Sequence, residues 1–215
     1  MSLFYDCTKP SEREDALRSA AGAVDRGELV VLPTDTVYGV GADAFTPSAV
    51  GVLLAAKGRG RDMPVPVLVG SWKALDGLVL YLPNEARQLV EAFWPGALTV
   101  VVRHAPSLAW DLGDTRGTVA VRMPLHPVAL ELLKQTGPMA VSSANRTGQP
   151  PPTTAKAAEE QLGEAVAVYL DGGPCAEPVA STIVDLTGTS PRLLRAGAVG
   201  IEQLREVLPD LRTEG

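Results

Sequence analysis

The sequence has few of the residues that usually build metal centres or disulfide frameworks. Its 215 residues include two cysteines, Cys7 and Cys175, and two histidines, His104 and His126. The cysteines lie far apart and show no metal-ligand spacing, which suits a reducing, cytoplasmic location. Each histidine stands next to a proline or an Ala-Pro pair, so we expect surface or capping roles and no protein metal site.

Excess positive charge and long apolar runs are also absent. The formal net charge is −6, whereas a protein that holds nucleic acid mainly through its phosphates is usually basic. Extended binding of RNA by this chain alone is therefore not expected, although a local basic pocket would still allow RNA contact. The apolar runs are too short to span a bilayer, and the acidic N-terminal segment with Glu12 and Glu14 is unlike a signal peptide. We expect no membrane partner.

Several common catalytic motifs do not occur. No Gly-Lys-Ser or Gly-Lys-Thr is present, so a nucleotide would be held by something other than a Walker loop. No Gly-x-Ser-x-Gly is present either, which argues against a nucleophile elbow. Residues 39–44 loosely match a dinucleotide fingerprint, but their glycines do not directly follow the preceding strand, and we reject that interpretation.

Helical and strand patterns alternate along the whole chain. We expect a capping box at Ser11 and Glu14 to start the first helix, and Pro66 to place its strand at a sheet edge. The predicted helices span 11–26, 46–57, 71–78, 84–93, 126–136, 154–162 and 200–208. The predicted strands span 29–32, 65–69, 98–102, 118–122, 139–142, 166–170, 182–186 and 193–194. This mixture predicts an α/β fold in which helices cover a twisted sheet, and the absence of a linker predicts one domain over 1–215.

Two segments near the N-terminal half combine polar residues with glycine. Thr34, Asp35 and Thr36 follow a buried strand, where ligand sites gather in α/β folds; the alternative is a turn held by side-chain bonds to the backbone. Lys57 and Arg59 stand in the run Lys-Gly-Arg-Gly-Arg. Lysine there could complement a helix dipole, but the intervening glycines and guanidinium groups favour close approach to phosphate.

Three later segments carry further candidates. Arg122 interrupts an apolar strand, so it forms either a structural ion pair or a contact with a carboxylate ligand. Ser143 and Asn145 follow a strand and either cap a helix or line a ligand site. Ser181 and Arg195, taken singly, are ordinary.

Taken in order, these segments resemble the YrdC-like family of threonylcarbamoyl-AMP synthases over nearly the whole chain. The matching motifs are Pro-Thr-Asp-Thr-Val-Tyr-Gly at 33–39, Lys-Gly-Arg at 57–59, Trp-Pro-Gly-Ala-Leu-Thr at 94–99, Val-Arg-Met-Pro at 121–124, Ser-Ser-Ala-Asn-x-x-Gly at 142–148, Ser-Thr-Ile-Val-Asp at 181–185 and Arg-x-Gly at 195–197. One such motif would be weak, whereas seven in order are a strong signal. Since the chain ends at Gly215, it resembles the short, single-domain form.

The resemblance implies a twisted, mostly mixed sheet with helices on both faces and a deep positive cleft. It implies a nucleotidyltransferase that converts L-threonine, bicarbonate or CO2, and ATP with Mg²⁺ into threonylcarbamoyl-AMP and pyrophosphate. A tRNA-modifying transferase complex would use this product. The implied site residues are Lys57 and Arg59 at the phosphates, as catalytic groups; Thr118, Ser143, Asn145 and Arg195 at the nucleotide; and Thr36, Arg122 and Ser181 at threonine, with Arg122 taking its carboxylate.

The sequence departs from the family pattern at three positions. Met63 stands where an asparagine that contacts ATP is common, and Leu68 replaces a histidine beside the threonine pocket. Pro151 replaces a serine, which removes a hydroxyl contact. Two alternatives to the synthase remain: a non-catalytic RNA-binding module of the same fold, and a related carbamoyl transferase. Members of the second group usually carry cysteine pairs in a much longer chain.

Overall fold

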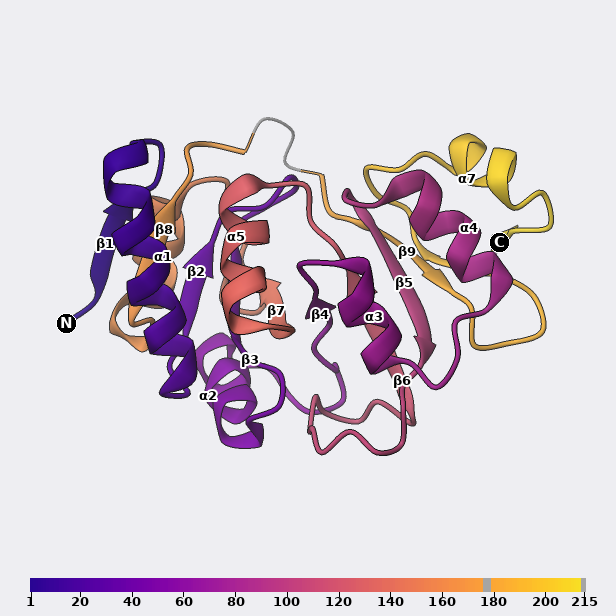
Figure 1. The fold of residues 1–215 in the computed structure, drawn as a ribbon, viewed down its shortest axis with the longest axis horizontal. Coiled ribbons are helices and arrows are strands. Elements are labelled where there is room, and N and C mark those ends of the chain that lie inside the picture. Colours follow the sequence, from indigo (N-terminus) through magenta and orange to yellow (C-terminus); the bar gives the residue numbers. More distant parts are fainter. Residues whose placement is uncertain (176–178, 214–215) are drawn as a thin grey trace.

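The computed structural model describes residues 1–175 and 179–213, which contain one 11-stranded mixed sheet (Figure 1). Its strand order is β1-β8-β2-β3-β7-β4-β6-β5-β9-β10-β11, and parallel and antiparallel pairs alternate irregularly across it. The strands are β1 (Leu3–Asp6), β2 (Val30–Leu32), β3 (Gly39–Asp43), β4 (Val67–Leu68), β5 (Leu98–Arg103), β6 (Thr118–Arg122), β7 (Met139–Ser143), β8 (Val168–Asp171), β9 (Thr182–Asp185), β10 (Arg192–Arg195) and β11 (Arg212–Thr213). The predicted mixed α/β sheet is confirmed.

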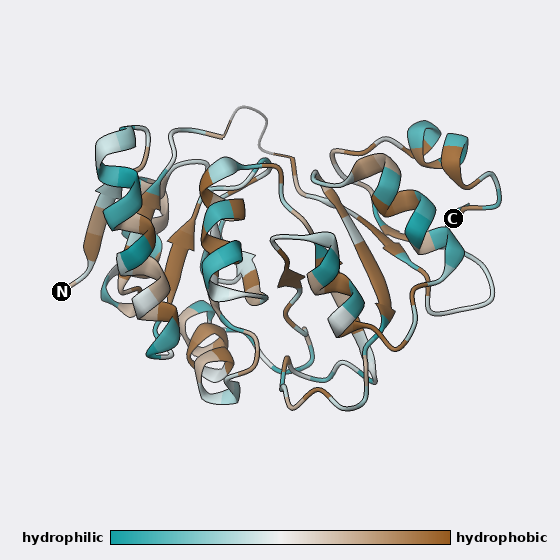
Figure 2. Ribbon diagram, in the orientation of Figure 1, coloured by the Kyte–Doolittle hydropathy of each residue, from teal (hydrophilic) through white to brown (hydrophobic). Residues whose placement is uncertain are grey.

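Helices cover both faces of the sheet. They are α1 (Pro10–Asp25), α2 (Pro47–Lys57), α3 (Trp72–Leu78), α4 (Asn84–Phe93), α5 (Pro127–Thr136), α6 (Ala155–Leu162), a 3-10 turn (Gly163–Ala165) and α7 (Ile201–Val207). Successive strand residues enter two different cores: Val30 and Leu32 pack with α1 and α5, whereas Val31 packs with α2 and α6. This alternation is what a strand buried on both faces requires. Figure 2 shows apolar strands, and helices such as α1 and α4 that carry polar residues, whereas α2 is largely apolar.

Two local predictions were wrong. The helix α1 begins at Pro10, with Lys9 in extended conformation before it, and Ser11 lies inside the first turn; proline at the first helical position fixes the start. The strand β4 lies inside the sheet, between β7 and β6. Pro66 precedes the paired residues, and its carbonyl oxygen accepts a hydrogen bond from Val141 N at 2.9 Å, so its missing N–H costs the sheet nothing.

Some elements were not predicted. Strand β3 is formed by Gly39–Asp43, which sequence analysis treated only as part of a polar segment. Its glycines allow close packing, since a Cβ at Gly39 or Gly41 would lie 2.7 or 2.9 Å from the side chain of Val141. The short edge strands β1 and β11 also carried no clear pattern. The prediction of one domain over 1–215 includes residues 176–178 and 214–215, which lie outside the described residues. Within the described residues, no helix combines the length and apolar character needed to cross a membrane.

Candidate active site

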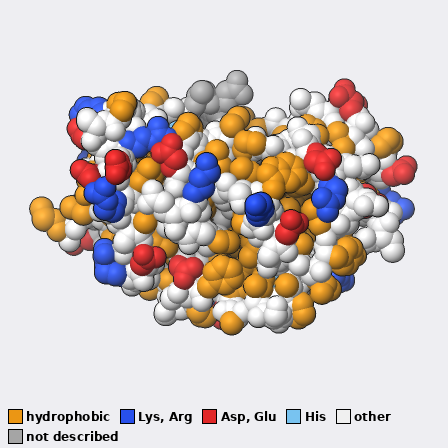
Figure 3. Space-filling view, viewed as in Figure 1, with side chains coloured by type: hydrophobic (Ala, Val, Ile, Leu, Met, Phe, Trp, Pro, Cys, Tyr) orange, Lys and Arg blue, Asp and Glu red, His pale blue; other side chains and the backbone are white. Residues whose placement is uncertain are grey.

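A pocket of about 310 Å³ opens where the segment after β2 meets the ends of β6, β7 and β10. Six of the nine predicted site residues line it: Thr36, Arg59, Arg122, Ser143, Ser181 and Arg195. On the outer face in Figure 3, positive and negative side chains stand next to one another over α1 and α4. By contrast, the described pocket lining includes three arginines and no aspartate or glutamate. The pocket is therefore suited to anions.

Residues 33–38 form one wall of the pocket as a closely bonded turn. Thr34 Oγ1 donates to Val37 O at 2.6 Å and accepts from Thr36 N at 3.1 Å. Buried Tyr38 anchors the turn to the end of β8, because its hydroxyl bonds to Gly173 O and to Asp171 Oδ1 at 3.1 Å. Burial raises the pKa of Tyr38, which keeps it neutral. The turn interpretation was thus correct, and the turn also lines the site.

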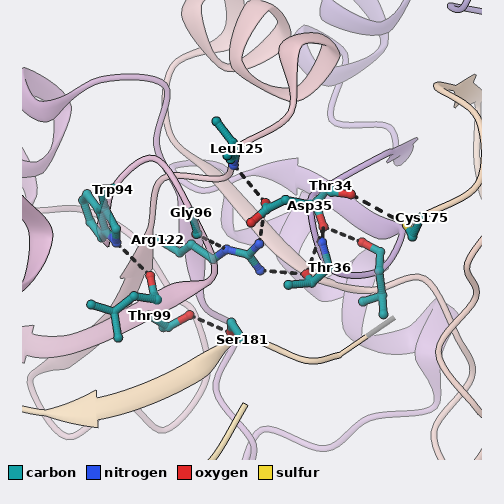
Figure 4. A network of polar contacts seen from close by, with 12 residues as sticks. Thr34, Asp35, Thr36, Trp94, Gly96, Thr99, Arg122, Leu125, Cys175 and Ser181 are labelled. Carbon is teal, nitrogen blue, oxygen red and sulfur yellow. Dashed lines mark hydrogen bonds and ion pairs between the residues drawn. The ribbon is translucent and has the colours of Figure 1, made fainter. Parts of the chain in front are cut away.

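Arg122 lies at the end of β6, nearly buried, with three contacts that fix its plane (Figure 4). Its Nε donates to Gly96 O at 2.9 Å and its Nη1 to Thr36 Oγ1 at 2.9 Å. Its Nη2 donates to Asp35 Oδ1 at 2.6 Å. A guanidinium has five N–H bonds, so two remain beyond these contacts. Burial lowers the pKa of Arg122, and the carboxylate of Asp35 opposes that effect.

The segment 94–99 supports Arg122 from below. Gly96 supplies the carbonyl oxygen that Arg122 Nε contacts, and its N donates to Met123 O at 2.8 Å. Trp94 Nε1 donates to Leu98 O at 2.7 Å and so holds the loop closed. A Cβ at Gly96 would lie 2.4 Å from Phe93 O, which explains the glycine. This segment therefore mainly holds Arg122 in position and contributes little to the pocket lining.

Arg59 reaches the pocket because α2 ends at Gly58, which adopts the left-handed conformation (φ 61°). The turn directs Arg59 over β7, where Nη1 donates to Ser142 Oγ at 3.0 Å and Nη2 to Pro64 O at 3.2 Å. No carboxylate among the described residues forms an ion pair with it. Burial lowers the pKa of Arg59, and the charge of nearby Asp62, which forms no ion pair with it, opposes that effect. The charge of Arg59 is therefore available to a ligand.

Lys57 and Asn145 lie directly behind Ser143. Lys57 is 4% exposed, and its Nζ donates to Asn145 O at 2.6 Å and to Ser143 O. Burial, and next the charge of Arg59, lowers the pKa of Lys57 to about 8. Asn145 Nδ2 donates to Gln149 O at 2.8 Å, while its buried Oδ1 has no protein partner in the described part of the chain. These two residues shape the pocket wall and do not line it.

Thr118 is the third predicted site residue that does not line the pocket. It begins β6, and its Oγ1 donates to Thr115 O at 2.8 Å. Along a strand, four residues separate it from Arg122 by roughly 13 Å. Ala120, between them, does line the pocket. The contact of Thr118 with a nucleotide stays a prediction.

Ser181 and Arg195 form one unit on the opposite wall. Arg195 Nε and Nη2 donate to Ser181 O at 2.9 and 2.7 Å, and Nη2 also donates to Ser181 Oγ at 2.9 Å. Gly197 lets the two segments cross, since a Cβ there would lie 2.3 Å from Ala180 O. Burial, and next the charge of Arg122, lowers the pKa of Arg195. Thr99 Oγ1 lies 2.9 Å from Ser181 Oγ and extends the network.

Asp35 and Thr99 are functional neighbours that sequence analysis did not assign. Asp35 stood in the first polar segment, but nothing in the sequence linked it to Arg122, 87 residues later. Of the departures from the family pattern, Leu68 and Pro151 line the pocket, whereas Met63 is exposed and does not. Next to Met63, a backbone atom contributes instead: Pro64 O accepts a hydrogen bond from Arg59.

Comparisons with known proteins agree on one family. The Sua5/YciO/YrdC family model, described as "Telomere recombination", matches residues 22–197. A putative threonylcarbamoyl-AMP synthase of Mycobacterium tuberculosis is 62% identical over 208 residues, covering 97% of this chain and 96% of that protein. The threonylcarbamoyl-AMP synthase of Bacillus subtilis is 38% identical, with 98% of this chain and 62% of that protein covered.

A solved structure gives the same answer in three dimensions. Pyrococcus abyssi Sua5 complexed with L-threonine matches with a TM-score of 0.91 and 37% identity. The match covers 100% of this chain and 62% of that one, so this chain spans less than two thirds of the Pyrococcus protein. Escherichia coli YciO, at 22% identity and a TM-score of 0.85, supports the fold alone.

Proposed function

The chain belongs to the Sua5/YciO/YrdC family, and from this premise we propose that it is a threonylcarbamoyl-AMP synthase. It is an enzyme of the nucleotidyltransferase class, and its substrates are L-threonine and ATP. The observation that carries the proposal is the pocket itself. Within the described residues it combines one arginine neutralised by a carboxylate, Arg122, with two that have none, Arg59 and Arg195.

The third substrate is bicarbonate or the CO2 formed from it. Bicarbonate first takes up a proton and loses water to give CO2. The neutral amine of threonine then forms a C–N bond to the carbon of CO2, one C=O π bond opens onto oxygen, and the nitrogen releases a proton to solvent, which gives a carbamate. A carbamate oxygen then attacks the α-phosphorus of ATP, and the bond from that phosphorus to the bridging oxygen breaks. Pyrophosphate leaves with the electron pair, and threonylcarbamoyl-AMP remains. No protein nucleophile is needed, because the step depends on alignment and on stabilising negative charge.

The arginines divide this work. Arg122 binds the carboxylate of threonine with its two remaining N–H bonds, beside the hydroxyls of Thr36 and Ser181. Arg59 and Arg195 bind the phosphates, where guanidinium pairs well with their oxygens. Ser143 lines the nucleotide side. Asn145 holds the wall in place from behind, where its buried Oδ1 has no partner among the described residues.

Lys57 supports the phosphate site from behind. Its charge lies below the pocket wall and stabilises negative charge that develops during transfer. Its contacts with Ser143 O and Asn145 O also fix the turn that carries both residues. We assign it a catalytic role through electrostatics.

Magnesium fits this site as part of the ATP complex. The described residues contain no group of three or more His, Cys, Asp or Glu side chains that could hold a metal ion. Mg²⁺ usually keeps several waters and binds through substrate phosphates, so the hydroxyls of Ser142 and Ser143 would at most contact its water shell. When bound, the ion would neutralise phosphate charge and orient the leaving group.

The product is a mixed anhydride and must pass to an acceptor. A transferase complex that modifies adenosine in tRNA would consume it, and this requires a protein or RNA contact at or near the pocket opening. The free thiols of Cys7 and Cys175 agree with a cytoplasmic location, which stays a prediction.

The test is ATP consumption and pyrophosphate release with and without threonine and bicarbonate. We expect both to be required, and the adenylate to appear by chromatography in equal amount to pyrophosphate. Pyrophosphate release that does not depend on threonine, or that needs a different amine, would contradict the proposed reaction and favour a related carbamoyl transferase. No ATP consumption at all would favour the RNA-binding module.

A further inference from the structure

Two arginines in the pocket differ in their charge environment. Arg122 and Arg195 line the same cavity, close enough that the charge of Arg122 affects Arg195. Arg122 has a carboxylate partner, Asp35, at 2.6 Å. Arg195 is bound by the neutral oxygens of Ser181 and has no acidic partner among the described residues. The same pocket therefore offers a neutralised guanidinium and an unneutralised one.

Asp35 is placed to act on Arg122 and on nothing in the cavity. Its side chain is 16% exposed and does not belong to the described pocket lining, whereas its neighbours Thr34 and Thr36 do. Oδ1 accepts from Arg122 Nη2 and also from Leu125 N at 2.9 Å. The second contact fixes the carboxylate from the far side, as Figure 4 shows. Asp35 is thus built to hold the guanidinium, and a ligand in the pocket would not contact it.

Electrostatics gives this arrangement a consequence for substrate sorting. A triphosphate carries several negative charges and is attracted most strongly to unneutralised cations. Threonine presents one carboxylate, which needs orientation and two donors more than net charge. If Arg122 were unpaired, phosphate oxygens would compete for it because it lies beside Arg195.

We propose that Asp35 is a positioning residue that reserves Arg122 for the carboxylate of threonine and keeps phosphate groups off it. This inference rests on the proposed function. It adds a physical reason why threonine and ATP occupy different sides of the same pocket. Gly96 O and Thr36 Oγ1 complete the orientation, and among the described residues Asp35 is the one carboxylate paired with Arg122.

The test uses the full chain and the variant Asp35→Asn, which keeps an acceptor oxygen but removes the charge. Inorganic phosphate is the probe, and the readout is adenylate formation followed by chromatography. In the unaltered protein we expect phosphate to compete with ATP and not with threonine. In Asp35→Asn we expect the KM for threonine to rise about tenfold, and phosphate to become a competitor of threonine.

Asp43→Asn is the matched control. Asp43 ends β3 on the same segment of chain, and its carboxylate accepts from Thr46 and Phe45 N, away from the pocket. It loses the same charge, so a general electrostatic effect would appear in both variants. We expect no competition between phosphate and threonine in Asp43→Asn.

The outcomes separate the two proposals. If the unaltered protein forms no adenylate that depends on threonine, the proposed function fails and Asp35 is not at issue. If that protein is active and Asp35→Asn shows a higher KM without phosphate competition, Asp35 has a merely structural role and the inference is overturned. Should Asp35→Asn not fold, Asp35→Glu retains the charge and displaces it. Asp35→Glu must then raise the KM for threonine while phosphate still does not compete with threonine. Competition between phosphate and threonine in that variant would overturn the inference.

Discussion

The Nζ of Lys57 lies 2.6 Å from the carbonyl oxygen of Asn145, which follows it by 88 residues. This contact joins the last residue of α2 to the turn after β7, and a second one to Ser143 O strengthens it. An ammonium group is thus used to fix a backbone turn in a nearly dry environment.

The first prediction concerns the pH dependence of stability. The pKa of Lys57 is lowered from 10.5 to about 8 by burial. Below pH 8 both the folded and unfolded chains hold the proton, so the full cost of burying the charge is present. Between about pH 8 and pH 10.5 the unfolded chain holds more protons than the folded one, so the free energy of unfolding rises with pH. The rise from this one group should be on the order of 3 kcal/mol across that window.

Chemical denaturation at several pH values measures this effect, as the difference between the unaltered protein and Lys57→Met. Lys57→Met should lose the rise, because methionine does not titrate. Lys134→Met, on the exposed side of α5, should keep it. A stability difference between the unaltered protein and Lys57→Met that stays constant from pH 7 to pH 11 would contradict the assignment.

Much of the fold could be predicted from local patterns, for physical reasons that particular elements illustrate. Helix α2 was predicted from Thr46 to Lys57, because a proline marks its first turn and a glycine its end. Strand β3 was not predicted, since glycine has a low strand propensity. Glycine occurs there because a larger residue would collide with the side chain of Val141. The position of β4 inside the sheet depends on strands distant in sequence, which local patterns do not reveal.

The site shows the same division. Arg122 could be identified as unusual because a charge within an apolar strand needs a partner. Its partner Asp35 could not, because the pairing depends on how the turn after β2 folds back toward β6. The structure shows the ion pair with Asp35, and two N–H bonds remain for a ligand, so the two interpretations are compatible; the contact with a carboxylate ligand stays a prediction. Sequence alone presented them as alternatives.

The second prediction concerns Arg59. Arg59→Ala removes a cation that has no acidic partner among the described residues and that lines the pocket. Loss of such a donor to developing phosphate charge should cost about 2–4 kcal/mol in transition-state stabilisation. Pyrophosphate release in the presence of threonine and bicarbonate measures it.

Arg61→Ala is the control for Arg59. Arg61 stands two residues away, but its side chain is 57% exposed and is paired with Asp111 at 2.7 Å outside the pocket. We expect near-normal release from that variant. Equal losses in both variants would indicate that the segment acts through general charge and that Arg59 has no direct role.

The third prediction concerns Arg122. Arg122→Lys keeps the charge beside Asp35, so the partly buried carboxylate stays paired and the protein should fold. An ammonium cannot reproduce the contacts with Gly96 and Thr36 together with a forked contact to a carboxylate. The KM for threonine should rise by about tenfold or more, on the order of 1.4 kcal/mol, while the KM for ATP changes little.

Steady-state kinetics with each substrate varied in turn distinguishes these effects. Arg103→Lys, at the exposed end of β5, is the matched control and should behave as the unaltered protein does. If Arg122→Lys raised the KM for ATP and left that for threonine unchanged, the assignment of the two substrates to the two sides of the pocket would be reversed.

The fourth prediction concerns Gly197. It has no side chain to contact a ligand, but its small size allows Arg195 to take its position in the pocket. A Cβ at this position would lie 2.3 Å from Ala180 O and 2.5 Å from the backbone of Ser181. Both are backbone atoms that cannot swing away, so Gly197→Ala must push the segment with Arg195 off Ser181. Overpacking of this kind typically costs about 1–3 kcal/mol in stability, and the displacement should weaken ATP binding more than threonine binding.

Gly188→Ala, where the nearest atom would lie at 3.9 Å, tests whether alanine itself matters. Calorimetric titration of ATP into both variants compares them, and unchanged ATP affinity in Gly197→Ala would mean that Arg195 does not depend on the crossing for its position.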